Sequence, residues 1–394
     1  MGQELVFVGA VILVAIASKG ALTRVGVPPL VGYLAVGFVA RLFFDQTPVV
    51  GPGAVEALEA LGLVGVTVLL FRVGLKSNVG ALLAQLRRAT PIWLANIVVS
   101  AFLGYAAAAW ILGWDTVTSI VVAIALTATS VGVATAVWTR AGRLETPEGE
   151  LFIDVAELDD ITGVVAVAAL LSVLVDLPEG EQWPLDVVAS SIGAVMLVLA
   201  GFVAAMYAFA HWAEGPTTRL FERVGEPRHP MLLVAATGLV FAGAAEMLGL
   251  SVAVGAFFAG LAYSRDPVAV QHERDFEVLY DLFVPFFFIQ VGLQVTPGAF
   301  ADAIVPGLVL LAAAIVGKVA GTFVPGLFVT SGATAGLLAV SMIPRAEIAL
   351  LVSQQTEAMG YIPNQTLSAV TFVSAVTCLG APWLLNRLLR RREA

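Results

Sequence analysis

Charged residues are scarce in this sequence. Asp, Glu, Lys and Arg make up 12% of its 394 residues, against about 25% in soluble domains, while hydrophobic residues make up 59%. This composition excludes a soluble globular protein and indicates an integral membrane protein. Cysteine occurs only once, at Cys378, so the chain cannot form an intramolecular disulfide bond.

Long apolar segments, by contrast, fill most of the chain. Most of the thirteen segments are close to the roughly 20 residues that a helix needs to span a bilayer. They cover residues 4–20, 27–44, 58–75, 90–112, 116–138, 151–175, 186–210, 230–249, 250–264, 276–293, 303–328, 331–356 and 366–388. We therefore predict an all-α polytopic membrane protein with about thirteen transmembrane helices, forming a single membrane unit over residues 1–394.

Lysine and arginine are missing from every second loop, for example from "DLPEGEQWPLD" (176–186). Because basic residues in short loops mark the cytoplasmic side, an odd number of spans places the N-terminus outside and the C-terminus in the cytoplasm. We expect the chain in the inner (cytoplasmic) membrane. The basic residues of the other loops are Lys19, Arg24, Lys76, Arg87, Arg88, Arg140, Arg143, Arg219, Arg223, Arg228, Arg265, Arg274, Arg387, Arg390, Arg391 and Arg392. The predicted cytoplasmic loops also hold the three histidines, His211, His229 and His272.

Two stretches of the first half return in the second half. The segment "FRVGLKSNVGALL" (71–83) resembles "IQVGLQVTPGAFA" (289–301), and "LVGYLAVGFVAR" (30–41) resembles "AVGAFFAGLAYS" (253–264), with both glycines in register. The similar offsets of 218 and 223 residues predict repeats at 27–175 and 250–388, with linker helices at 186–249. Because seven spans separate the copies, they would be inserted in opposite orientations. Inverted repeats with a site near the bilayer midplane are typical of secondary transporters.

Two adjacent aspartates lie inside an expected membrane helix, in "AELDDITGVV" (156–165). Asp160 is nine residues from the start of the span at 151, which is roughly 14 Å into a hydrocarbon core of roughly 30 Å. An ionised carboxylate at this depth is costly, so it indicates a functional site. Glu157 shares the helix face of Asp160, whereas Asp159 is turned by about 100°. We therefore expect the two aspartates to have different partners and different roles.

Lys318 is a buried base with no charged neighbour in its segment, "LLAAAIVGKVAGTFVP". A lysine in the middle of a span pairs with an acid across helices or stays neutral. Asp159 is the candidate partner. The pairing would leave Asp160 for a different task.

Two membrane segments contain helix-breaking or polar residues. The segment "AVSMIPRAEIALLV" (339–352) has Pro344 in mid-span, where proline interrupts the hydrogen-bond ladder and frees carbonyl groups that can hold an ion. The segment "ALTATSVGVATAVW" (125–138) is its counterpart under the repeat. The polar residues at the two interruptions are Thr127, Thr129 and Ser130 in the first, and Arg345 and Glu347 in the second.

The chain resembles the monovalent cation:proton antiporter-2 group, and most closely its NapA-like sodium/proton exchangers. The matching stretches run in family order over nearly the whole chain: "VPPLVGYLAVGFVA", "TATSVGVA", "LETPEGELFIDVAELDDITG", "PFFFIQVGLQV", "GKVAG" and "IPRAEIALLV". The resemblance implies an antiporter fold with two discontinuous helices that cross. It also implies a homodimer in which ion-binding core and dimerisation subdomains are interleaved in sequence.

The resemblance also assigns roles to residues. Asp160 would bind the transported Na⁺ and exchange protons, and Asp159 would form a salt bridge with Lys318. Thr127 and Thr129 would lie at the crossing beside the site, Arg345 and Glu347 would balance charge there, and Glu157 and Ser130 are possible accessory residues. The potassium-efflux branch of the group usually carries Gln-Asp where this chain has Asp159-Asp160, which favours sodium.

We therefore expect a Na⁺(Li⁺)/H⁺ antiporter that works by alternating access at the aspartate pair and is electrogenic, without a cofactor and without a nucleic-acid partner. A potassium/proton antiporter of the same group and a sodium-coupled symporter of an organic solute are the alternatives. An enzyme is not expected, because an intramembrane aspartyl protease needs aspartates facing each other from separate helices, and the sequence has no Gly-x-Gly-Asp motif.

Overall fold

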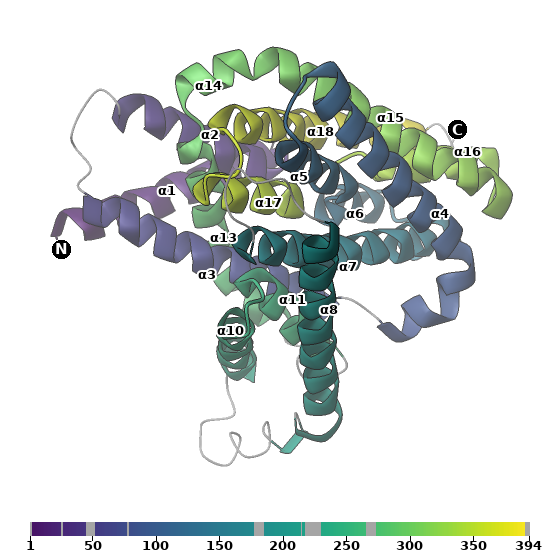
Figure 1. Ribbon diagram of the computed structural model, residues 1–394, viewed down its shortest axis with the longest axis horizontal. Coiled ribbons are helices and arrows are strands. Elements are labelled where there is room, and N and C mark those ends of the chain that lie inside the picture. Colours follow the sequence, from purple (N-terminus) through teal and green to yellow (C-terminus); the bar gives the residue numbers. More distant parts are fainter. Residues whose placement is uncertain are drawn as a thin grey trace. The chain divides into compact units, whose positions relative to one another are not determined.

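A computed structural model describes residues 2–24, 27–44, 52–76, 79–176, 185–213, 215–216, 230–264 and 273–390 (Figure 1). Within these ranges every regular element is a helix, as the sequence predicts. His229, His272 and most of the acidic loop at 176–186 lie outside the described residues, as do Arg219, Arg223, Arg228, Arg265, Arg391 and Arg392. His211 is in a π-helical turn, η2 (Phe209–Ala213), instead of the expected loop, because the preceding helix continues into that turn.

Eight described helices are long and apolar enough to cross a membrane. Four shorter apolar helices accompany them, and α7 (Pro147–Asp176) is 30 residues long but carries several acids. Each of the thirteen apolar segments coincides with a helix or with two consecutive half-helices. The protein is therefore a multi-pass membrane protein, while a total of about thirteen spans stays a prediction.

The chain divides into two compact units, each built from segments far apart in the sequence. The first contains residues 1–12, 51–78 and 164–288, and the second contains residues 13–50, 79–163 and 289–394. Three helices run from one unit into the other: α1 (Gly2–Arg24), α7 and α13 (Glu273–Gln294).

In the first unit, α11 (Val252–Tyr263) packs against both α3 (Pro52–Lys76) and α10 (Pro230–Met247). The unit also contains α8 (Leu185–Ala208). The α3–α11 contact is a close approach of two backbones: a Cβ atom added to Gly74 would lie 2.0 Å from the Phe257 carbonyl oxygen, and one added to Gly260 would lie 2.0 Å from that of Phe71. Only glycine fits at either position.

The second unit contains the same kind of contact. A Cβ atom added to Gly37 of α2 (Pro29–Phe44) would lie 2.0 Å from the Ile289 carbonyl oxygen, and one added to Gly292 of α13 would lie 2.2 Å from that of Leu34. By the offsets found in the sequence, Gly37 corresponds to Gly260 and Gly292 corresponds to Gly74. The paired glycines therefore make corresponding contacts within each unit.

The rest of the second unit surrounds two interrupted helices. α15 (Ile304–Val329) packs along α4 (Val79–Ala106), α16 (Gly332–Ser341) and α18 (Asn364–Arg390), and α17 (Glu347–Ala358) packs against α18 and α5 (Thr116–Thr127). The remaining helices of the unit are η1 (Ala107–Ile111), α6 (Val131–Arg140) and α14 (Pro297–Asp302).

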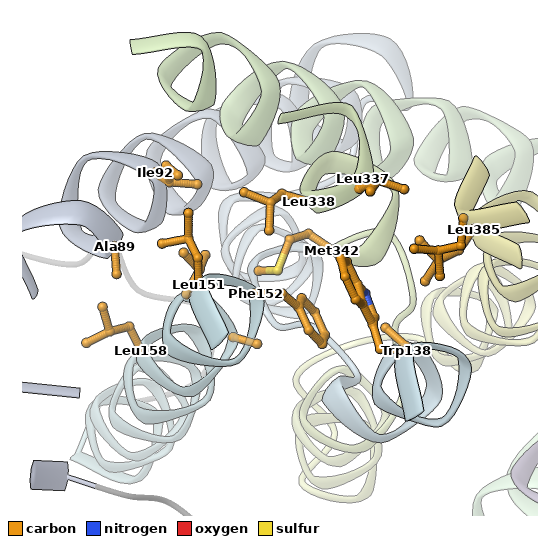
Figure 2. Close-up of a cluster of buried hydrophobic side chains, with 14 residues drawn as sticks. Ala89, Ile92, Trp138, Leu151, Phe152, Leu158, Leu337, Leu338, Met342 and Leu385 are labelled. Atoms are coloured by element: carbon orange, nitrogen blue, oxygen red, sulfur yellow. The ribbon is translucent and has the colours of Figure 1, made fainter. Parts of the chain in front are cut away.

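A hydrophobic cluster fixes α7 against the half-helices α6 and α16 (Figure 2). The rings of Trp138 and Phe152 stack at 6.0 Å between centroids, and Met342 lies beside them. The Trp138 indole N–H also donates to Ser341 Oγ at 2.9 Å, so its polar atom is satisfied within the core. The cluster thereby ties the helix that carries the aspartate pair to both interrupted segments.

Candidate ion-binding site

Both segments expected to be interrupted are interrupted in the structure. α5 ends at Thr127 and α6 begins at Val131, with extended backbone at Ala128 and Ser130. α16 ends at Ser341 and α17 begins at Glu347. The Ser130 backbone N–H donates to the Pro344 carbonyl oxygen at 2.8 Å, so the two interruptions touch each other. Proline cannot continue the helical ladder, and its carbonyl here accepts a bond from the other broken segment.

The first half-helix of each broken segment, α5 and α16, begins with an N-cap side chain. The Asp115 side chain accepts a hydrogen bond from Thr118 N at 3.0 Å at the start of α5, and Ser331 Oγ accepts one from Thr334 N at 3.2 Å at the start of α16. N-cap side chains of this kind satisfy backbone donors that have no partner within the helix. The half-helices therefore begin at fixed residues and end where the two segments meet.

Two basic side chains satisfy the carbonyl end of α5. Lys318 Nζ donates to the Thr127 carbonyl oxygen at 2.5 Å, and Arg345 Nη1 donates to that of Ala128. Positive charge is favourable at a helix C-terminus, where carbonyl groups lack partners within the helix. Lysine and arginine thus take the place of water at a helix end buried in the protein.

Asp159 has a full set of hydrogen-bond donors. Lys318 Nζ lies 2.6 Å from Asp159 Oδ2, with neither side chain exposed, and Thr129 Oγ1 donates to the same oxygen at 2.6 Å. Asn96 Nδ2 donates to Asp159 Oδ1 at 3.0 Å. Three donors, from α4, from α15 and from the break between α5 and α6, therefore hold this buried carboxylate.

Asp160 is buried like its neighbour but lacks bonded partners in the described chain. Its side chain is 7% exposed, and it makes no hydrogen bond or ion pair with any residue in the described ranges. Asp159, Glu157, Glu347 and Lys318 lie within electrostatic range of it. A buried carboxylate without a bonded partner is costly, so it needs a proton or a cation to offset its charge.

The remaining expected site residues lie around the crossing in different ways. The Thr127 hydroxyl donates to the Ile124 carbonyl oxygen at 2.7 Å, so only the carbonyl of Thr127 faces Lys318. The buried Ser130 hydroxyl lies close to the Glu347 side chain. Glu347 is half-buried at the start of α17, and Glu157 is half-buried on α7. The structure thus brings all of these residues to the crossing or to α7 beside it.

Arg345 is fully buried at the crossing. Its backbone N–H donates to Thr377 Oγ1 at 3.2 Å, and Cys378 Sγ donates to its carbonyl oxygen at 3.0 Å, so α18 holds this turn in place. It forms no ion pair with Glu347 in the part of the chain that the structure describes. Its guanidinium instead donates to the Ala128 carbonyl oxygen at the end of α5.

Asn96 was not among the residues expected from the sequence. It is fully buried on α4, and it bonds to Asp159 directly. The only signal available was a single amide in the apolar stretch "PIWLANIVVS", and polar residues of this kind usually form bonds between membrane helices.

Buried charges at the contact of two broken helices define an ion-transporting membrane protein, since irregular backbone is tolerated at that depth where protein or a polar pathway satisfies it. Comparison with known proteins agrees with this class. The model of the transmembrane sodium/hydrogen exchanger family matches residues 9–391. This chain belongs to that family.

Two relatives and one solved structure illustrate the match. The chain is 29% identical to the high-affinity Na⁺/H⁺ antiporter NhaS3 of Synechocystis sp., over 84% of this chain and 71% of the relative. It is 25% identical to the Na⁺/H⁺-K⁺ antiporter GerN of Bacillus cereus, over 98% of this chain and 96% of the relative. The sodium proton antiporter MjNhaP1 of Methanocaldococcus jannaschii has the same fold, with a TM-score of 0.76 at 13% identity over 98% of both chains. The chain is a sodium/proton exchanger of the membrane.

Proposed function

We propose that exchange takes place at Asp160, where Na⁺ and H⁺ alternate on one carboxylate. The observation that carries this proposal is the contrast between two neighbours: Asp159 accepts three bonds, whereas Asp160 accepts none from the described residues. A carboxylate already saturated by fixed donors has little capacity for a cation. The one beside it keeps its lone pairs for the transported ion.

Antiport then follows from competition for one charge. An ionised Asp160 is costly to carry through a low-dielectric barrier, whereas a protonated or cation-bound Asp160 is neutral. If only the neutral forms change access between the two sides, each Na⁺ moved one way requires a proton moved the other way. Alternating access needs no further chemical group, and no cofactor is required.

The Asp159–Lys318 pair supplies the electrogenic step in this proposal. When the pair takes up and releases a second proton during the cycle, more than one proton moves for each Na⁺. Each net charge carried across the membrane is then worth about 2.3 kcal/mol per 100 mV. The short contacts of Lys318 Nζ with Asp159 and with the Thr127 carbonyl couple this proton to the broken helix.

We further propose that the chain contains approximate inverted repeats at 27–175 and 250–388, with 186–249 as linker helices and with core and dimerisation subdomains interleaved in sequence. The corresponding glycine contacts of Gly37 and Gly260 support the repeat. The arrangement as a homodimer in the inner membrane, with the C-terminus in the cytoplasm, follows from the family resemblance and from the basic residues. Arg140 at the end of α6 and Arg387 and Arg390 at the end of α18 fit a cytoplasmic side.

Sodium, with lithium as a smaller substitute, is the proposed cation. The name of GerN includes potassium, which keeps potassium/proton exchange as an alternative for this chain. A sodium-coupled symporter of an organic solute is a further alternative, and it would show no proton movement when Na⁺ alone is added.

Purified protein in proteoliposomes that contain a pH-sensitive dye tests these functions together. Adding Na⁺, Li⁺ or K⁺ ranks the cations by the proton movement that each one triggers. Asp160→Asn, which keeps the size of the side chain and removes its charge, should abolish the signal for every cation. Proton movement that persists at the wild-type rate in Asp160→Asn would contradict the proposed site.

A further inference from the structure

We propose that Asn96 is a positioning residue of the exchanger: it holds Asp159 on Lys318 and so keeps Asp160 as the single carboxylate that the cation meets. This inference rests on the proposed role of Asp160. It adds a residue on α4, a helix to which neither the sequence patterns nor the family resemblance gives a site residue.

The amide of Asn96 is oriented from both sides. Its Nδ2 donates to Asp159 Oδ1 at 3.0 Å, and its Oδ1 accepts a longer bond from Thr322 Oγ1 at 3.5 Å. Asn96 and Thr322 are both fully buried. The hydroxyl of Thr322 therefore keeps the carbonyl side of the amide turned towards α15 and its N–H₂ side turned towards Asp159.

Close packing of α4 on α15 sets the register of this contact. A Cβ atom added to Gly321 would lie 2.8 Å from Asn96 Cα, and one added to Gly317 would lie 3.0 Å from Ser100 Cα. Gly317 and Gly321 are the small residues of a small-xxx-small motif, which lets membrane helices approach backbone to backbone. Lys318 lies between these two glycines. The same packing thus brings Asn96 and Lys318 to opposite oxygens of one carboxylate.

Asn96 and Lys318 bind different oxygens of the Asp159 carboxylate. Asn96 is the one donor to Oδ1 among the described residues, and Lys318 and Thr129 both act on Oδ2. Without the amide, the Asp159 carboxylate can rotate about its Cβ–Cγ bond, and Lys318 is no longer confined to one oxygen. Lys318 lies within electrostatic range of Asp160. A lysine that moves towards Asp160 opposes a cation there.

This role predicts a specific kinetic signature. Loss of Asn96 should weaken apparent Na⁺ binding, because the Asp160 charge becomes partly offset by Lys318. The maximal rate should change much less, because Asp160 and its proton remain. A merely structural asparagine would instead lower the yield of folded protein and leave the KM for Na⁺ of the folded fraction unchanged.

The test compares initial exchange rates over a range of Na⁺ concentrations for reconstituted wild type, Asn96→Leu and Thr322→Val. Leucine matches the size of asparagine without its amide, and Asn96→Ser serves in its place where the leucine variant does not fold. We expect Asn96→Leu to raise the KM for Na⁺ roughly tenfold, the scale of one hydrogen bond to a charged group, with the maximal rate within about twofold of wild type. Thr322→Val should raise KM in the same direction by less.

Ser100→Ala is the matched control. Ser100 lies one helical turn from Asn96, is equally buried and also meets α15, but its hydroxyl has no partner among the described residues. Its KM should equal that of wild type. An unchanged KM in the Asn96 variants, or an equal rise in Ser100→Ala, overturns the role of Asn96. A wild-type protein that moves no protons with any cation would overturn the exchange at Asp160 instead, so the two failures are distinct.

Discussion

Lys318 Nζ lies 2.6 Å from Asp159 Oδ2, and neither side chain is exposed. The pair joins α15 to α7 at the point where α5 is interrupted, since the same ammonium also bonds to the Thr127 carbonyl. One lysine thus serves a carboxylate and a helix end at once. Substitution of Lys318 should therefore change both the stability of the protein and its exchange activity.

The stability of this pair can be measured with a double-mutant cycle. Lys318→Met leaves the Asp159 charge buried without its ion-pair partner. Asp159→Asn leaves the Lys318 charge buried without its partner. Breaking a buried pair from one side costs about 3–5 kcal/mol, whereas removing both charges costs much less. Thermal unfolding in detergent should therefore show two strongly destabilised single variants and a double variant that regains more than half of the loss. Purely additive losses would mean that the two side chains do not interact.

Voltage dependence tests the second role of the pair. If its proton makes exchange electrogenic, Lys318→Gln and Asp159→Asn should each reduce the response of the exchange rate to a membrane potential imposed on proteoliposomes. Ser100→Ala, which touches neither group, should keep the wild-type response. An unchanged response in both Lys318→Gln and Asp159→Asn would remove the pair from the electrogenic step.

Much of this arrangement can be predicted from the sequence, because prolines and charged residues stand out in an otherwise apolar membrane segment. Pro344 in mid-span predicts the break in the α16–α17 segment, and the few charges inside apolar segments point to Asp159, Asp160 and Lys318. Apolar length alone places the helices. These features are local, so they do not depend on how the helices pack.

The parts that could not be predicted depend on contacts between distant segments. Asn96 carries no charge, and its meeting with Asp159 depends on how Gly321 lets α4 approach α15. The sequence also could not distinguish the two polar groups of Thr127, whose hydroxyl turns back to its own helix while its carbonyl receives Lys318. Only the packed structure decides which atom of a residue faces the site.

Competition at Asp160 predicts how sodium affinity depends on pH. Protons and Na⁺ compete for the same carboxylate in the proposed mechanism. A lower pH therefore raises the fraction of Asp160 that is protonated and cannot bind Na⁺ until its proton leaves. The apparent KM for Na⁺ should therefore rise as pH falls, approaching about tenfold for each pH unit once the protonated form dominates. The maximal rate at saturating Na⁺ should stay nearly constant. A maximal rate that falls with pH while KM stays constant would place the proton on a separate group.

The glycine contacts give a prediction about the repeat. Alanine at Gly260 puts a Cβ atom 2.0 Å from the Phe71 carbonyl oxygen, and alanine at Gly37 puts one 2.0 Å from that of Ile289. The helices must separate in both variants, and overpacking of this kind costs about 1–3 kcal/mol or more. Gly201→Ala in α8 is the control, because an added Cβ atom there meets nothing within 4 Å and alanine favours the helix.

Thermal unfolding of the three variants in detergent measures these effects. Gly260→Ala and Gly37→Ala should lower the unfolding temperature by similar amounts, because each breaks the corresponding contact of its own unit, while Gly201→Ala should match or exceed wild type. A large loss at Gly260 with none at Gly37 would show that the two contacts are not equivalent. The repeat would then account for the similar sequences without accounting for the way their helices pack.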